Sequence, residues 1–286
     1  MSRRSIPPHV FFLCSALFHY LGPAFAVLLF AQIHPLGVAW LRIASAGAVF
    51  ALWRRPWRFV NRTIVALGVV LAAMNVCFYL AISRLPLGTV GAIEFLGPIA
   101  LAAAGARTRR NLLALALATA GVYALTRVRL AGDPLAYLFA FANCALFVLY
   151  VVLGHRIAAR SGIDRLGAAM LVAMVVALPL GIRDAMPAFH SPTLLGAAIG
   201  VGISSSVIPY VCDQLAMARL PRSTFALLLA LLPATATVVG LLALQQVPTA
   251  QDLTGVALII TGVALHQSLP REQENACSTH ELEHPV

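Results

Sequence analysis

Long apolar segments follow one another along almost the whole chain, and they constrain its fold more than any other feature of the sequence. A helix needs roughly 20 apolar residues to cross a hydrocarbon layer about 30 Å thick. Only 10% of the 286 residues are charged, against about 25% in a soluble domain. The sequence therefore predicts an all-α polytopic membrane protein with ten transmembrane helices. The ten segments cover residues 8–31, 36–53, 63–83, 87–105, 111–126, 134–153, 165–182, 193–215, 223–243 and 253–268.

The distribution of arginine predicts how these helices are oriented. All 20 basic residues are arginines, and most lie in short loops between the apolar segments. With the N-terminus in the cytoplasm, 15 arginines lie inside, four lie outside, and Arg42 falls within a segment. Basic residues are enriched in cytoplasmic loops, so we expect a multi-pass protein of the plasma (inner) membrane with both termini cytoplasmic. A nucleic-acid partner is not expected, because its binding would require the arginines to gather on one face.

The two halves of the chain resemble each other. Val76–Pro98 aligns without a gap on Val211–Pro233, with ten of 23 positions identical. The match includes Arg84-Leu85-Pro86 over Arg219-Leu220-Pro221. Five segments per half is an odd number, so the second copy must enter the membrane from the opposite side. We therefore predict two inverted five-helix repeats, an architecture of secondary transporters whose substrate site lies between the halves. The predicted units are residues 1–130, residues 131–269 and a disordered cytoplasmic tail over residues 270–286.

Two charged residues lie deep inside apolar segments, Arg42 in the second and Glu94 in the fourth. An intramembrane charge is costly, so it indicates a functional site. Glu94 is predicted to bind a substrate amine, to carry a proton, or to do both; the alternative is a structural ion pair. The second half lacks both charges, with Leu229 at the position of Glu94, and this joint absence predicts that the two residues neutralise each other. For Arg42, binding of a substrate carboxylate and snorkelling to the outer interface remain alternatives.

Several other residues in the apolar segments carry polar groups or interrupt helices. Asn75, Tyr79, Asn143 and Tyr210 are further candidates for substrate binding or coupling, with interhelical hydrogen bonding as the alternative. Prolines can kink a helix, and four of them interrupt segments. Pro98 and Pro233 occupy matching repeat positions, which predicts a paired hinge. The interrupting prolines are Pro23, Pro98, Pro209 and Pro233.

Two features of the eighth segment are assigned structural roles. Asp213 and Gln214 stand close to its cytoplasmic end, so we expect them at the membrane interface. Gly196 and Gly200 form a small-x-x-x-small pattern, which predicts close packing against another helix.

Four motifs stand between residues 35 and 268: Leu41-Arg42, Arg55-Pro56-Trp57-Arg58, Arg84-Leu85-Pro86-Leu87-Gly88 and Glu94-Phe95-Leu96-Gly97-Pro98. Together they resemble the EamA-type branch of the drug/metabolite transporter superfamily, and most closely its threonine/homoserine exporter group. The resemblance implies ten helices in two inverted halves and export of amino acids or related metabolites. Two segments depart from the group. A Met-Glu-Pro element is replaced by leucines within residues 228–234, and residues 19–23 replace a glycine-rich stretch.

The sequence thus predicts a secondary transporter that works by alternating access and uses a small-molecule substrate within the lipid bilayer. Export of drugs or toxic compounds is the alternative in the same class, and a membrane-embedded enzyme or interaction protein is the alternative outside it. No glycine-rich phosphate loop is present, so ATP hydrolysis and other enzyme chemistry are not expected. No cofactor or metal is expected, because no Asp-rich or His-rich cluster occurs. A homodimer is left open.

Overall fold

The computed structural model describes residues 7–85, 87–104, 108–126, 133–158, 161–232 and 249–266, and regular structure within them is helical throughout. Pro233, one of the two predicted hinges, and the tail over residues 270–286 lie outside the described residues. The helices are α1 (Pro8–Leu29), α2 (Pro35–Arg54), η1 (Pro56–Phe59), α3 (Arg62–Ile82), α4 (Leu87–Ala104), α5 (Arg109–Thr126), α6 (Pro134–Ala158), α7 (Gly162–Phe189), α8 (Pro192–Gly202), η2 (Ile203–Val207), α9 (Ile208–Met217), α10 (Arg222–Leu228), η3 (Leu229–Leu231) and α12 (Ala250–Leu265).

The boundaries of the helices follow from local sequence signals. Pro35 stands in the first turn of α2, where its missing N–H would have no helical partner. α2 ends before Arg55, which adopts the left-handed conformation (φ 49°) and precedes a proline. α3 begins after Asn61, whose side chain accepts a hydrogen bond from the backbone N–H of Ile64 at 3.0 Å.

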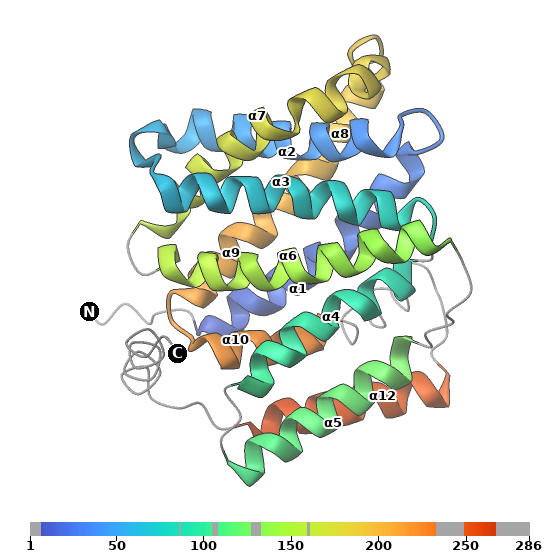
Figure 1. Ribbon diagram of the computed structural model, residues 1–286, viewed down its shortest axis with the longest axis vertical. Helices are drawn as coiled ribbons and strands as arrows, with labels where there is room; N and C mark the ends of the chain where they lie inside the picture. The colour runs from blue at the N-terminus through green and yellow to red at the C-terminus, as the bar shows by residue number, and fades with distance from the viewer. Residues whose placement is uncertain are drawn as a thin grey trace, which may run out of the picture.

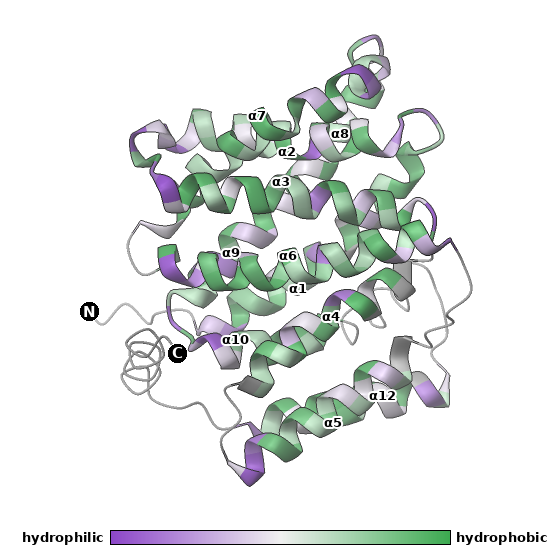
Figure 2. Ribbon diagram, in the orientation of Figure 1, coloured by the Kyte–Doolittle hydropathy of each residue, from purple (hydrophilic) through white to green (hydrophobic). Residues whose placement is uncertain are grey.

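Six of the helical spans are long and apolar enough to cross a membrane, and shorter apolar helices accompany them. Apolar residues dominate the length of the helices, whereas polar residues gather at their ends and in the turns (Figure 2). The all-helical, membrane-spanning character predicted from the sequence is therefore confirmed. The six spans are Pro8–Leu29, Pro35–Arg54, Arg62–Ile82, Pro134–Ala158, Gly162–Phe189 and Pro192–Met217.

The helices lie side by side in one bundle (Figure 1). α2 packs along α7, α3 lies against both α6 and α7, and α5 pairs with α12. α1 packs on α8, η2 and α9. Glycines permit close contact at some of these crossings: the Cβ position of Gly37 is only 2.4 Å from the backbone oxygen of Asp184.

The packing predicted for Gly196 and Gly200 is not observed within the described part of the chain. No atom lies within 4 Å of the Cβ position of either glycine, beyond their own helix and neighbouring residues. The small-x-x-x-small pattern in α8 therefore faces away from the helices that the structure describes.

The span Pro192–Met217 changes its winding near its middle, where η2 (Ile203–Val207) forms a π-helical turn. Pro209, the second residue of α9, has no N–H to donate to the carbonyl of Ser205, four residues earlier. π-turns are frequently found at functional sites. The predicted interruption at Pro209 is thus present, and it makes the Ser205 carbonyl available to another residue.

Candidate functional site

A small cavity lies at the centre of the bundle, between α1, α2, α3, α4, α6 and α9. Its volume is about 20 Å³, which is room for about one water molecule. Five of the six candidates for substrate binding or coupling line it, although they come from five different helices. The lining residues are His19, Pro23, Arg42, Met74, Asn75, Phe78, Glu94, Asn143, Phe147 and Tyr210.

Arg42 is held by the π-turn on one side and by an aromatic ring on the other. Its Nε donates to the Ser206 hydroxyl and its Nη2 donates to the Ser205 carbonyl, each at 2.7 Å. Its guanidinium carbon lies 5.7 Å from the ring centre of Tyr79, a distance at which a cation is attracted to the ring face. Arg42 is only 5% exposed, so the predicted alternative of snorkelling to the interface is wrong.

Glu94 has a neutral partner rather than a cation. The Asn143 amide donates to Glu94 Oε1 at 2.9 Å, and both side chains are buried. The amide oxygen of Asn143 is buried without a hydrogen-bond partner among the described residues. A buried acceptor without a partner costs free energy of folding. The Asn143 amide oxygen lies beside the Glu94 carboxyl group, so the two together suit a ligand that donates hydrogen bonds.

The predicted ion pair between Arg42 and Glu94 is absent. The ion pairs found in the described part of the chain are His34–Asp184, Arg54–Asp164 and Arg84–Asp133. Arg42 and Glu94 border the same cavity, but each is held by different partners. The structure therefore contradicts the prediction that Arg42 and Glu94 neutralise each other in an ion pair.

The remaining candidates take different positions around the cavity. The Asn75 amide donates to the Leu71 carbonyl of its own helix at 2.8 Å. Tyr79 does not line the cavity; it is fully buried beside Arg42, and its hydroxyl has no hydrogen-bond partner among the described residues. Tyr210 lines the cavity with its ring 5.4 Å from that of Tyr150. Pro98 lies in α4, one turn beyond Glu94.

The sequence predicted Asp213 and Gln214 at the membrane interface, and the structure places both in buried positions near the end of α9. Each is only 2% exposed. The span runs on to Met217 and is covered by α1 and α6, so both residues lie within the bundle. The Ser15 hydroxyl donates to Asp213 Oδ1 at 2.5 Å, and the Tyr150 hydroxyl donates to Oδ2 at 3.1 Å.

Sequence reasoning missed the apolar walls of the cavity. Met74, Phe78 and Phe147 are ordinary apolar residues in apolar helices, so no local signal distinguishes them. His19 and Pro23 stand in the stretch where the sequence departs from the resembling group, and that departure was the available signal. A guanidinium and a carboxyl group in one small, largely apolar cavity can together bind a small molecule that carries both charges. The described residues contain no cluster suited to a metal ion.

Comparison with known proteins shows the family of the chain. Residues 134–266 match the model of the EamA-like transporter family. The chain is 31% identical over 251 residues to the threonine/homoserine exporter RhtA of Escherichia coli K12, covering 84% of each protein. It is 30% identical over 251 residues to RhtA of Salmonella typhimurium LT2, again covering 84% of each.

A solved crystal structure shares the fold, with a TM-score of 0.72 and 19% identity over 90% of this chain and 96% of the other. The apolar spans and the named relatives agree on a transporter of the inner membrane rather than an enzyme. The chain is therefore a multi-pass membrane protein that belongs to the EamA-like transporter family, as a relative of the threonine/homoserine exporters.

Proposed function

We propose that this protein exports amino acids or closely related small zwitterions by alternating access. The observation that carries the proposal is the convergence of Arg42, Glu94 and Asn143 on one buried cavity. The relatives are named for export of threonine and homoserine, whose shared chemistry is a small polar side chain on an amino acid. A cavity with one cationic and one acidic side chain matches that chemistry.

Each charged end of such a substrate has a partner in the cavity. The carboxylate binds the Arg42 guanidinium, which the π-turn holds in a fixed orientation. The ammonium group binds Glu94 and the unpaired amide oxygen of Asn143. A proton and the ammonium group compete for the Glu94 carboxyl, and this competition couples export to proton movement.

The cavity must enlarge to admit an amino acid, because a volume of about 20 Å³ holds little more than a water molecule. The movement required is that of the helices whose side chains line it. Pro98 lies one turn from Glu94 in α4, where a missing backbone hydrogen bond makes bending easier. We assign the hinge to Pro98 and to its repeat counterpart Pro233.

The contacts between helices support ten spans in two inverted repeats, residues 1–130 and 131–269. If α8 to α9 counts as the eighth span, α10 as part of the ninth and α12 as the tenth, equivalent spans pack on one another: α2 on α7, α4 on α10, and α5 on α12. The contact of α3 with α6 has its counterpart in that of α1 with α8 and α9. Asn75 and Tyr210, which are equivalent by the 135-residue shift, both line the cavity. An approximate two-fold axis accounts for all these pairs.

A counterflow experiment tests the function. Purified protein in liposomes loaded with unlabelled threonine should accumulate radiolabelled threonine or homoserine from outside. Two analogues serve as matched competitors: the amino alcohol, which lacks the carboxylate, and the hydroxy acid, which lacks the amine. Neither should compete at concentrations at which threonine does. Failure to exchange any amino acid, or equal competition by a one-charge analogue, would contradict the proposal.

The orientation proposed from arginine predicts where Cys277 lies. A variant that keeps Cys277 and has alanine in place of the other four cysteines should react with a membrane-impermeant thiol reagent only after the cells are opened. The reason is the 15-to-4 arginine bias, which places the C-terminus in the cytoplasm. Labelling of Cys277 in intact cells, measured by mass shift on a gel, would show that the C-terminus lies outside and would contradict the proposed orientation.

A further inference from the structure

We propose that Ser15, Tyr150 and Asp213 form a gate that closes one side of the substrate cavity, with Asp213 as the residue that holds it shut. This inference rests on the proposed transport function and adds to it a second polar group, outside the cavity. The three side chains come from α1, α6 and α9, and Asp213 joins them through hydrogen bonds from both hydroxyl groups. We call this trio the Asp213 latch.

The latch lies to one side of the cavity in all three helices. It is displaced toward the end of the bundle at which α1 begins and α6 and α9 end (Figure 1). Along α1, the cavity residue His19 is one turn farther from that end than Ser15. Along α6, Phe147 precedes Tyr150 by three residues, and along α9, Tyr210 precedes Asp213 by three residues.

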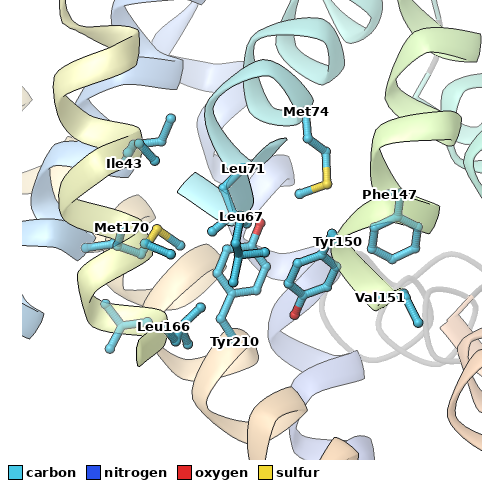
Figure 3. Packing of buried hydrophobic residues seen from close by; sticks show 14 of the residues in the cluster. Ile43, Leu67, Leu71, Met74, Phe147, Tyr150, Val151, Leu166, Met170 and Tyr210 are labelled. Carbon is cyan, nitrogen blue, oxygen red and sulfur yellow. The ribbon is translucent and has the colours of Figure 1, made fainter. Parts of the chain in front are cut away.

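The aromatic ring of Tyr150 connects the latch to the cavity wall. It stacks on Phe147 with ring centres 5.8 Å apart and lies 5.4 Å from the ring of Tyr210 (Figure 3). Phe147 and Tyr210 both line the cavity, and Tyr150 is fully buried. A substrate leaving the cavity toward this end must displace the Tyr150 ring, which its hydroxyl ties to Asp213.

A second hollow lies at the end of the bundle toward which the latch is displaced. Its volume is about 160 Å³, and it is bordered by the ends of α2, α6 and α9 and the start of α7. Gln214, the residue after Asp213, lines it, and so does the Arg54–Asp164 ion pair. Along α6 and α9, the latch residues Tyr150 and Asp213 therefore stand between residues of the central cavity and residues of this larger hollow, as a gate between a binding site and a vestibule would.

The chemistry of the latch explains how it closes. A carboxylate in an apolar surrounding needs hydrogen bonds to its charged oxygens, and hydroxyl groups supply them to both oxygens of Asp213. Neither hydroxyl carries a charge, and no basic side chain pairs with Asp213 in the described part of the chain. Two hydrogen bonds from uncharged hydroxyl groups close the gate without the strength of an ion pair, so it can also open.

Two native cysteines report on the gate directly. Cys14 precedes Ser15, Cys212 precedes Asp213, and their thiols lie close enough to interact across α1 and α9. In a variant with alanine at the other three cysteines, copper(II)–phenanthroline should oxidise this pair to a disulfide, counted as the loss of two maleimide-reactive thiols. Threonine exchange should then fall about tenfold or more, and reduction should restore it.

Tyr150→Phe tests the latch without removing the ring. It should raise the rate at which a charged, water-soluble thiol reagent labels Cys14 and Cys212 by about tenfold, the effect of losing one hydrogen bond to a charged group. Ser15→Ala should act in the same direction. Tyr123→Phe, at an exposed tyrosine of α5, and Ser204→Ala, whose hydroxyl bonds only to its own helix, are the matched controls.

The outcomes separate the gate from the transport function. Unchanged exchange after the disulfide forms, or labelling of Tyr150→Phe equal to that of Tyr123→Phe, would overturn the gate even when the wild type exchanges threonine. Absence of exchange in the reduced wild type would instead overturn the proposed function. The labelling rates need no substrate, so they test the gate in either case.

Discussion

Arg42→Met should abolish amino-acid exchange, with a loss of at least about 100-fold, and should also lower the stability of the folded protein. Exchange is lost because the substrate carboxylate has no cation to bind, and removing one partner of a buried charge pair costs about 3–5 kcal/mol, a factor of about 100 or more in affinity. Stability falls because the Ser205 carbonyl and the Ser206 hydroxyl lose their donor. An unsatisfied buried acceptor costs about 1–3 kcal/mol.

The measurements are counterflow of labelled threonine and the thermal midpoint of detergent-solubilised protein, followed by size-exclusion chromatography. Arg42→Lys should fold better than Arg42→Met yet still exchange poorly, since an ammonium group cannot bind Ser205, Ser206 and a carboxylate in the geometry of a guanidinium. Ser206→Ala removes only the Nε partner and should give an intermediate loss. Exchange by Arg42→Met at the wild-type rate would refute the assignment.

The helices were predictable because the membrane imposes a length on every apolar segment. α3 covers Arg62–Ile82, and the sequence had predicted 63–83. α7 extends farthest past its prediction among the described helices: it covers Gly162–Phe189, seven residues beyond the predicted end at 182. Arg183 and Asp184 indicated a loop there, but Asp184 pairs with His34, next to the start of α2, at 2.8 Å. The contact of Asp184 with His34 thus holds a charged residue within α7, at a position where the local sequence predicted the end of the helix.

The individual candidates were also predictable, because a polar group in an apolar helix is conspicuous. Their partners were not. Arg42 bonds to the π-turn, which exists because of Pro209 and the packing of α1 and α2 around it. Glu94 bonds to Asn143, a residue 49 positions away. The opposite charges of Arg42 and Glu94 suggested an ion pair, whereas in the fold each of these two residues bonds to neutral partners.

Removing both charges now has a different expected result. An ion pair predicts that a double change to leucine recovers much of the folded protein lost by each single change. Separate partners for Arg42 and Glu94 predict instead that the two losses nearly add. The yield of detergent-stable protein from the two single variants and the double variant distinguishes these results. Recovery of the yield in the double variant would show that Arg42 and Glu94 do pair directly.

Glu94→Gln should remove the response of export to a proton gradient while leaving exchange measurable. Glutamine has almost the same shape, and its amide oxygen can still accept the hydrogen bond from Asn143, so the fold should be retained. It carries no exchangeable charge, so protons and the substrate amine no longer compete for this position. The weaker attraction for the ammonium group should raise the KM for exchange by about tenfold or more, the change that ~1.4 kcal/mol produces.

Asn143→Leu provides the control that separates coupling from binding. It removes the amide that contacts Glu94 and should also raise the KM, but it leaves the carboxyl group in place, so export should still respond to the gradient. Both variants are compared in liposomes, by efflux of labelled threonine with and without an acidic exterior. The wild type and Asn143→Leu should accelerate when the outside is acidic, because protons entering through Glu94 release the substrate amine. Acceleration of Glu94→Gln to the same degree would place the coupling proton on another residue, and Glu94 would then be a substrate ligand alone.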